Sequence, residues 1–150
     1  MKVYRFEAAL VLALTVAACS GGGDSTPKSE PAATQPTAAA ATGTDLTPDP
    51  GGKVITVEMS TDEKGSYFSP AEINARKGDV IRYTLKVGVH NVHFIADSNA
   101  GKSGYPSAPS EFLQLPAQTY DVKVQMAPGS YYFQCDPHAA LGMKGHVVVK

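Results

Sequence analysis

Several features that mark large classes of protein are missing from this chain of 150 residues. Basic residues are not in excess, since 13 Lys and Arg stand against 14 Asp and Glu, and no basic stripe is present. Nucleic acid is therefore not an expected partner, because its phosphates need such a stripe. No stretch has the period of a helix over a useful length, and short strand-like segments separated by turns predict an all-β fold.

Long apolar runs are missing as well. The run at residues 8–18 has eleven residues, whereas a helix needs about 20 to span the hydrocarbon core, so a retained transmembrane helix is not expected. Lys2 and Arg5 precede this run, and small residues end it before Cys19. This is the pattern of a secretory signal peptide over residues 1–18, and it predicts an exported protein.

The residues around the expected cleavage point, Val16-Ala17-Ala18-Cys19, resemble the bacterial lipobox. That resemblance implies a lipid on the Cys19 sulfur, an acylated amino terminus and cleavage just before Cys19. Ser20 resembles the residue that sorts such proteins to the outer membrane of Gram-negative cells. The expected location is extracytoplasmic, with the chain anchored by lipid to a bacterial membrane at the periplasmic face or the cell surface; plain secretion is the alternative.

The segment after the signal peptide, residues 19–52, holds Cys19 and is otherwise rich in Gly, Ser, Thr, Pro and Ala. It has almost no large apolar residue to bury, so we predict a disordered linker. As a coil of about 33 residues it would let a domain move roughly 30 Å from its anchor. Residues 53–150 are then long enough for one ordinary domain.

Alternating and β-branched residues divide this domain into short strands. We predict strands at residues 54–59, 80–87, 89–96, 119–126, 130–135 and 144–150. Turn residues such as Gly78 and Pro128 separate them, and the pattern favours a Greek-key β-sandwich. Residues 97–118 contain three prolines and read as an inserted loop, whose apolar residues are expected to pack on one flank.

Cysteine is scarce, with only Cys19 and Cys135 present. The two could in principle form a disulfide, but Cys19 stands where lipidation is expected. Cys135 is then an unpaired thiol in a compartment that oxidises exposed thiols, and burial as a metal thiolate would explain how it persists.

One short loop gathers three side chains that bind metals. Cys135, His138 and Met143 stand at C-x2-H-x4-M spacing, which combines a thiolate, an imidazole and a thioether. A thiolate with two histidines and a more distant axial methionine is the donor set of an electron-transfer copper site. We therefore predict a single copper ion bound by His90, Cys135, His138 and Met143. A buried inert thiol is the alternative for Cys135, but a protein core needs no histidine at this spacing.

The second imidazole has two candidates, His90 and His93. Residues at these positions of a strand point to opposite faces, so only one can reach the site. His90 shares its face with Val92 and Phe94, the bulkier apolar neighbours, and is the predicted ligand. His93 is the alternative ligand, and His146 is expected to face solvent.

These segments together resemble the small blue (type 1) copper proteins of the cupredoxin family, in the plastocyanin and pseudoazurin branch. The resemblance rests on His90-Asn91-Val92, on the residues 129–135 that lead to Cys135, and on the ligand loop, and it covers about residues 53–150. It implies a cupredoxin-like sandwich in which Asn91 donates its backbone N–H to the Cys135 sulfur and ties the two ligand segments together. Pro137 lacks an N–H, so a hydrogen bond that some such sites give the thiolate is missing, and we expect a lower potential.

The same resemblance implies a one-electron carrier that cycles between Cu(I) and Cu(II), has no small-molecule substrate and is not an enzyme. Redox proteins are the expected partners, docking on the apolar surface around His138. An acidic docking route is not expected, because Gln134 replaces an aromatic residue and only Asp97 remains of an acidic cluster. The alternative function is extracytoplasmic copper buffering or delivery, although a buried thiolate holds copper too tightly to release it easily.

Overall fold

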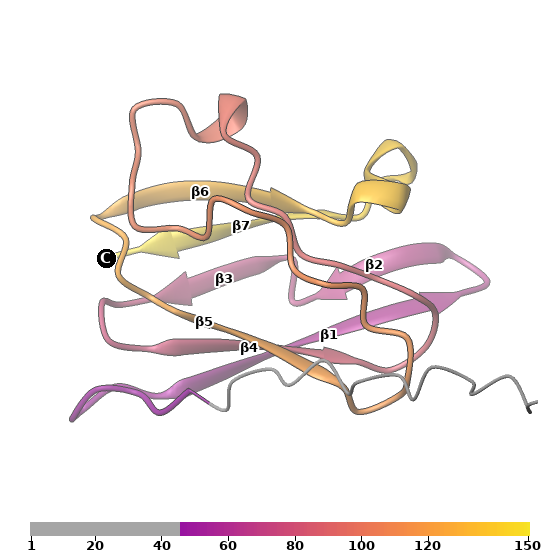
Figure 1. Cartoon of the computed structure of the whole chain (residues 1–150), viewed down its shortest axis with the longest axis horizontal. Coiled ribbons are helices and arrows are strands. Elements are labelled where there is room, and N and C mark those ends of the chain that lie inside the picture. Colours follow the sequence, from indigo (N-terminus) through magenta and orange to yellow (C-terminus); the bar gives the residue numbers. More distant parts are fainter. Residues whose placement is uncertain (1–45) are drawn as a thin grey trace, which may run out of the picture. The chain divides into compact units, whose positions relative to one another are not determined.

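The computed structural model describes residues 46–150 of the chain (Figure 1). The predicted signal peptide, the predicted lipidation site Cys19 and the predicted linker up to residue 45 lie outside the described residues. Within residues 46–150, no helix is both long enough and apolar enough to cross a membrane.

Strands provide almost all of the regular structure in this described part. They are β1 (Val54–Asp62), β2 (Gly65–Ser69), β3 (Glu72–Ala75), β4 (Val80–Leu85), β5 (Thr119–Lys123), β6 (Gly129–Gln134) and β7 (Lys144–Val149). Two short 3-10 helices, η1 (Asp97–Asn99) and η2 (Asp136–Leu141), lie between them. The all-β fold predicted from the sequence is confirmed.

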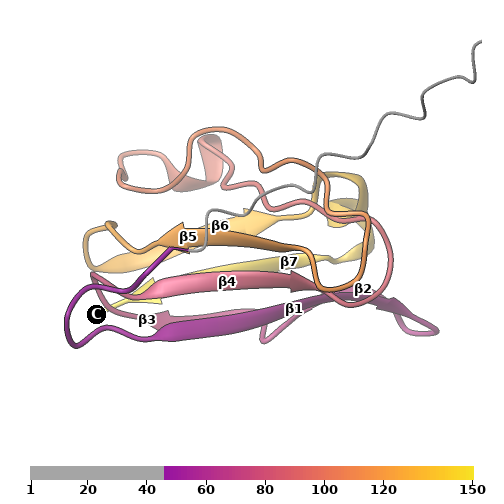
Figure 2. The ribbon, with the colours of Figure 1, turned by 60° about the horizontal axis from the view of Figure 1, so that its bottom comes forward.

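The strands form two sheets that pack as a sandwich. One sheet has the order β2-β1-β4-β5 and the other β3-β7-β6. The pairs β1–β4 and β3–β7 run parallel, and the other neighbours are antiparallel. In Figures 1 and 2 the layer of β6 and β7 lies over the layer of β1 and β4. The helix η2 follows β6 at one end of this sandwich, where the predicted ligand loop lies.

An aromatic cluster fills the space between the sheets and fixes the position of β6. The Phe133 ring is fully buried, and its centroid lies 4.9 Å from that of Phe68, 5.4 Å from Tyr83 and 5.6 Å from Phe94. Burying a ring of this size contributes about 1.5–3 kcal/mol. Because Phe133 stands two residues before Cys135, the same packing holds the start of the ligand loop.

The domain begins upstream of the predicted boundary at Lys53. The Leu46 N–H donates to Asp121 Oδ2 at 3.0 Å, and the Asp49 N–H donates to the Gly78 carbonyl at 2.9 Å. The disorder predicted for residues 46–52 is therefore wrong. A segment poor in apolar residues can still be held when its backbone hydrogen bonds to neighbouring strands and turns.

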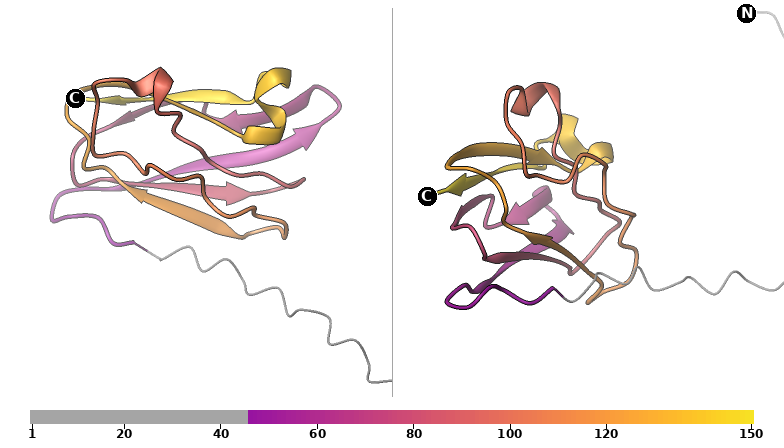
Figure 3. Two further views of the ribbon diagram at one scale, coloured as in Figure 1. Left: turned by 45° about the horizontal axis from the view of Figure 1, so that its top comes forward. Right: turned by 60° about the vertical axis from the view of Figure 1, so that its left-hand side comes forward.

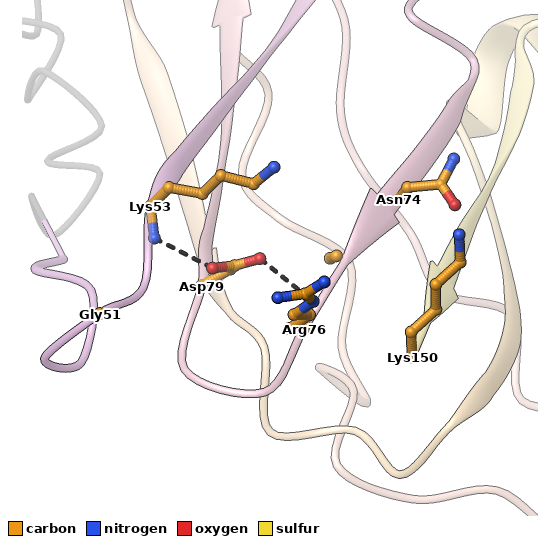
Figure 4. A pocket seen from close by; sticks show the side chains of 7 residues that line it. Gly51, Lys53, Asn74, Arg76, Asp79 and Lys150 are labelled. Carbon is orange, nitrogen blue, oxygen red and sulfur yellow. Dashed lines mark hydrogen bonds between the residues drawn. The ribbon is translucent and has the colours of Figure 1, made fainter.

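Asp79 joins the start of β1 to the turn that enters β4, at the end of the sandwich away from η2 (Figure 1). Its buried carboxylate accepts the backbone N–H of Lys53 at 2.9 Å and that of Arg76 at 2.9 Å, as Figure 4 shows. The pocket drawn there is lined by these residues and by Gly51, Asn74, Ala75 and Lys150. The carboxylate thus has a structural role, because it satisfies backbone donors of the turn that enters β4.

The insertion at residues 97–118 packs on the flank of β6, which is an edge strand. Asn99 is fully buried, and its side chain exchanges two hydrogen bonds of 2.8 Å with the backbone of Tyr132, as a neighbouring strand would. Tyr105 stacks on Phe94 at 6.0 Å, and Leu113 is buried. Figure 3 shows this loop beside β6. The expected packing of apolar residues is confirmed for Tyr105 and Leu113, whereas Phe112 and Leu115 are exposed.

The continuous strand predicted at residues 89–96 does not form. This segment crosses the end of the sandwich and pairs only at two isolated bridges, His90 with Leu113 and His93 with Gln134. The strands β2 and β3 were not predicted. Both lie at sheet edges, and neither carries the run of β-branched residues from which a strand is recognised.

Candidate metal centre

The ligand loop is a short turn closed by its own backbone. Pro137 stands in the first turn of η2. The His138 N–H donates to the Cys135 carbonyl at 3.1 Å, and the Met143 N–H donates to the His138 carbonyl at 3.1 Å. The Cys135 N–H in turn donates to the Met143 carbonyl at 3.1 Å. Gly142 ends η2 with φ of 101°, a left-handed conformation that glycine adopts without strain. These contacts bring Cys135, His138 and Met143 together within one turn.

The structure brings His90, Cys135 and His138 together, although His90 comes from the distant segment 89–96. Their potential ligand atoms all lie within 4.8 Å of one another. The two Nδ1 atoms are 3.2 Å apart, and Cys135 Sγ lies 3.6 Å from His90 Nδ1 and 3.4 Å from His138 Nδ1. A point equidistant from the three atoms is about 2.0 Å from each, close to the 2.0–2.3 Å at which imidazole and thiolate bind a small transition-metal ion. The three donors therefore fit one metal ion.

The tautomer of His90 is fixed by its outer nitrogen. His90 Nε2 lies 3.1 Å from the Val87 carbonyl and 3.2 Å from Thr61 Oγ1. Because a carbonyl only accepts hydrogen bonds, Nε2 carries the proton and Nδ1 keeps its lone pair. That lone pair is available to a metal ion. Hydrogen bonds of this kind orient ligating histidines and raise their basicity.

Burial also affects the protonation of Cys135 and His90. It raises the pKa of the Cys135 thiol, while backbone N–H groups of Asn91 and His138 act in the opposite direction. Burial also lowers the pKa of His90. Without a cation the site therefore favours a neutral thiol and a neutral imidazole. A soft cation that binds here displaces the thiol proton, and a thiolate with two imidazoles suits copper.

Met143 is fully buried in the core cluster next to this site. Its backbone belongs to the closed loop described above, so its side chain starts from the same turn as Cys135 and His138. The axial role of Met143 stays a prediction.

His93 lies outside the donor cluster. Its Nδ1 is 3.0 Å from Asp136 Oδ1, and its side chain is partly exposed. Asn91 is buried beside it and exchanges two hydrogen bonds of 2.8 Å with Asp136. Asp136 is not among the site residues predicted from the sequence, although a carboxylate directly after Cys135 is a visible signal. Thr61 gave no such signal, because it lies in β1, far from the ligand loop along the chain.

The two histidines of segment 89–96 give a direct test of this geometry. Replacing His90 by Ala should abolish the visible copper band and weaken copper affinity by more than about 100-fold, because a change in an outer-sphere partner alone costs 10–100-fold. Replacing His93 by Ala should keep the band. Copper titration followed by visible absorption measures both. The assignment would be reversed if His93→Ala lost the band and His90→Ala kept it.

The chain matches known proteins over the same residues that form this sandwich. The family model of copper binding proteins, plastocyanin/azurin family, matches residues 55–150. Plastocyanin A/B of Petroselinum crispum is 35% identical over 95 residues, which cover 62% of this chain and 97% of that protein. Plastocyanin of Prochlorothrix hollandica is 31% identical over 97 residues, which cover 64% of this chain and 72% of that protein.

A solved structure agrees with these matches. The oxidized form of plastocyanin from Dryopteris crassirhizoma has a TM-score of 0.52 and 32% sequence identity, and the alignment covers 63% of this chain and 99% of that one. The sandwich, the cluster of His90, Cys135 and His138, and the matches lead to one conclusion. This chain belongs to the copper-binding proteins of the plastocyanin/azurin family, and its site holds one copper ion.

Proposed function

We propose that this protein is a one-electron carrier tethered to a bacterial membrane, with one type 1 copper ion bound by His90, Cys135, His138 and Met143. The observation that carries the proposal is the triangle of two imidazole nitrogens and one cysteine sulfur with sides of 3.2, 3.4 and 3.6 Å. Copper bound there supplies a couple between Cu(I) and Cu(II). The plastocyanins that match this chain support the same class of function.

The surroundings of the donors suit electron transfer because they resist movement. Cys135 and His90 are fully buried, and His90 is held through its Nε2. The loop that carries Cys135 and His138 is closed by three backbone hydrogen bonds. Donors that stay in place in both oxidation states keep reorganisation small. The same burial argues against copper delivery, since a sealed thiolate releases its metal slowly.

Copper loading of the full chain tests this function. The wild-type protein should bind one copper ion and become intensely blue or green when oxidised. Cys135→Ser should abolish the colour, because the thiolate is lost, and Met143→Leu should keep the colour and raise the potential. Visible and EPR spectra with redox titration measure these effects. A colourless wild-type copper complex, or one that exchanges its metal rapidly without a reversible couple, would favour copper handling instead.

An apolar surface surrounds the one donor that approaches solvent. His138 is partly exposed, and with Val89, Phe112, Gln114 and Pro137 it lines a shallow, mostly apolar pocket. Leu141, on the same loop, is 75% exposed. We propose that redox partners dock here, and that the electron passes through the edge of the His138 ring. Such a contact depends on desolvation of apolar surface more than on attraction between charges.

Leu141→Glu tests the docking surface without changing a donor. The visible spectrum should be unchanged, while the second-order rate of reduction by a partner protein falls roughly tenfold, because a charge must be desolvated at the contact. Val54→Glu is the matched control, since Val54 is exposed at the start of β1, away from the loop. Stopped-flow kinetics over a salt series should show only a modest salt effect. An unchanged rate for Leu141→Glu with a steep salt dependence would place docking elsewhere.

We propose the membrane anchor and the extracytoplasmic location from the lipobox-like sequence alone, because Cys19 lies outside the described residues. The mature protein should begin at a lipidated Cys19 and sediment with membranes. Cys19→Ala should release the protein or stall its processing. Mass spectrometry of the mature amino terminus measures this. An unmodified terminus at any other residue would contradict the anchor and leave plain secretion.

A further inference from the structure

The carboxylate of Asp136 collects hydrogen bonds from three side chains. Asn91 Nδ2 donates to Oδ2 at 2.8 Å, His93 Nδ1 lies 3.0 Å from Oδ1, and Gln134 Nε2 donates to Oδ1 at 3.2 Å. The Asp136 N–H also donates to Asn91 Oδ1 at 2.8 Å. Since a carboxylate only accepts, His93 Nδ1 must carry a proton. We call Asp136 with these three partners the Asp136 cluster.

The Asp136 cluster joins the two segments that carry the copper ligands. Asn91 directly follows His90, and Asp136 directly follows Cys135. The backbones of His93 and Gln134 exchange two hydrogen bonds of 2.9 Å behind the cluster. Side-chain and backbone contacts therefore fasten the same two segments. A shift of one segment against the other would break several of them together.

The Asp136 cluster also keeps a negative charge close to the thiolate. The Asp136 carboxylate accepts hydrogen bonds from Asn91, His93 and Gln134, and the ionised form is the one that offers acceptors to all of them. Because Asp136 directly follows Cys135 along the chain, these hydrogen bonds hold the charge next to the sulfur.

We propose that Asp136 is a positioning residue that locks the His90 segment to the ligand loop and lowers the reduction potential of the copper site through its fixed negative charge. The physical reason is simple. A nearby anion stabilises the more positive Cu(II) state over Cu(I). The Asp136 side chain is 37% exposed, so solvent screens part of its charge, but its hydrogen bonds keep the carboxylate next to the buried Cys135. This inference rests on the proposed electron-carrier function.

Removal of the charge is the first test. In the full chain loaded with copper, Asp136→Asn should shift the equilibrium toward Cu(I) by about tenfold, which for a one-electron couple is about 59 mV upward. Asp97→Asn removes an exposed carboxylate from the insertion and should leave the potential unchanged. Asp136→Ser also removes the charge but keeps a short hydrogen-bonding side chain. It lets the charge effect be measured if the Asn variant does not fold. Redox titration followed by the visible band measures all three.

The fastening role has a separate readout in the metal-free protein. His93→Ala removes one donor from Asp136 and should speed alkylation of the Cys135 thiol several-fold, because the loop opens more often. His93→Asn keeps a donor near the place of Nδ1 and should restore most of the protection.

Equal potentials for Asp136→Asn and wild type, in chains with intact visible bands, would overturn the charge effect. Equal alkylation rates for His93→Ala and wild type would overturn the fastening. A wild-type chain that gives no visible copper band would instead refute the proposed function, so the two failures are distinguishable.

Discussion

The structure depends on holding three electron-rich atoms close together in a buried place. His90 Nδ1 and His138 Nδ1 are 3.2 Å apart, and both lie within 3.6 Å of Cys135 Sγ. Because the site is buried, these polar atoms have little water to bond with and can be satisfied only by one another or by a metal ion. Their positions must therefore be held by packing and hydrogen bonds elsewhere in the domain, which involve both sheets.

The fold meets this demand at several independent points. Phe133, packed between the sheets, fixes the end of β6 just before Cys135. Gly145 lies opposite Phe133 in β7, where any side chain would run into the ring and the neighbouring backbone. On the other side, β1 supplies Thr61 to His90. No single element positions the donors, which explains why a whole sandwich is needed to hold one small ion.

The sequence predicted the parts of the site that lie close together along the chain. Cys135 and His138 share one turn, so their spacing alone carries the geometry. Strand alternation favours His90 over His93 as the ligand, and the structure places His90 in the donor cluster. The alternation itself does not hold, because residues 89–96 form no strand and Asn91 is buried like His90 and Val92 on either side of it. His93 is held outside the cluster by Asp136. Contacts of this kind, and those of Thr61 and Val87, join residues far apart in sequence and are set by tertiary packing, which periodicity cannot reveal.

The two faces of the ligand loop differ in chemistry, and this separates two properties of the carrier. The pocket beside His138 is lined by Val89, Phe112, Gln114 and Pro137, whereas the Asp136 cluster consists of Asn91, His93, Gln134 and Asp136. The two sets share no residue. With partners docking at this pocket as proposed, changes at Val89, Phe112 or Gln114 would alter the contact and leave the charge beside Cys135 unchanged. Pro137 is the exception, because its lack of a backbone N–H is itself expected to lower the potential. Changes in the Asp136 cluster would alter the charge and leave the apolar surface intact, so encounter rate and potential would vary largely independently.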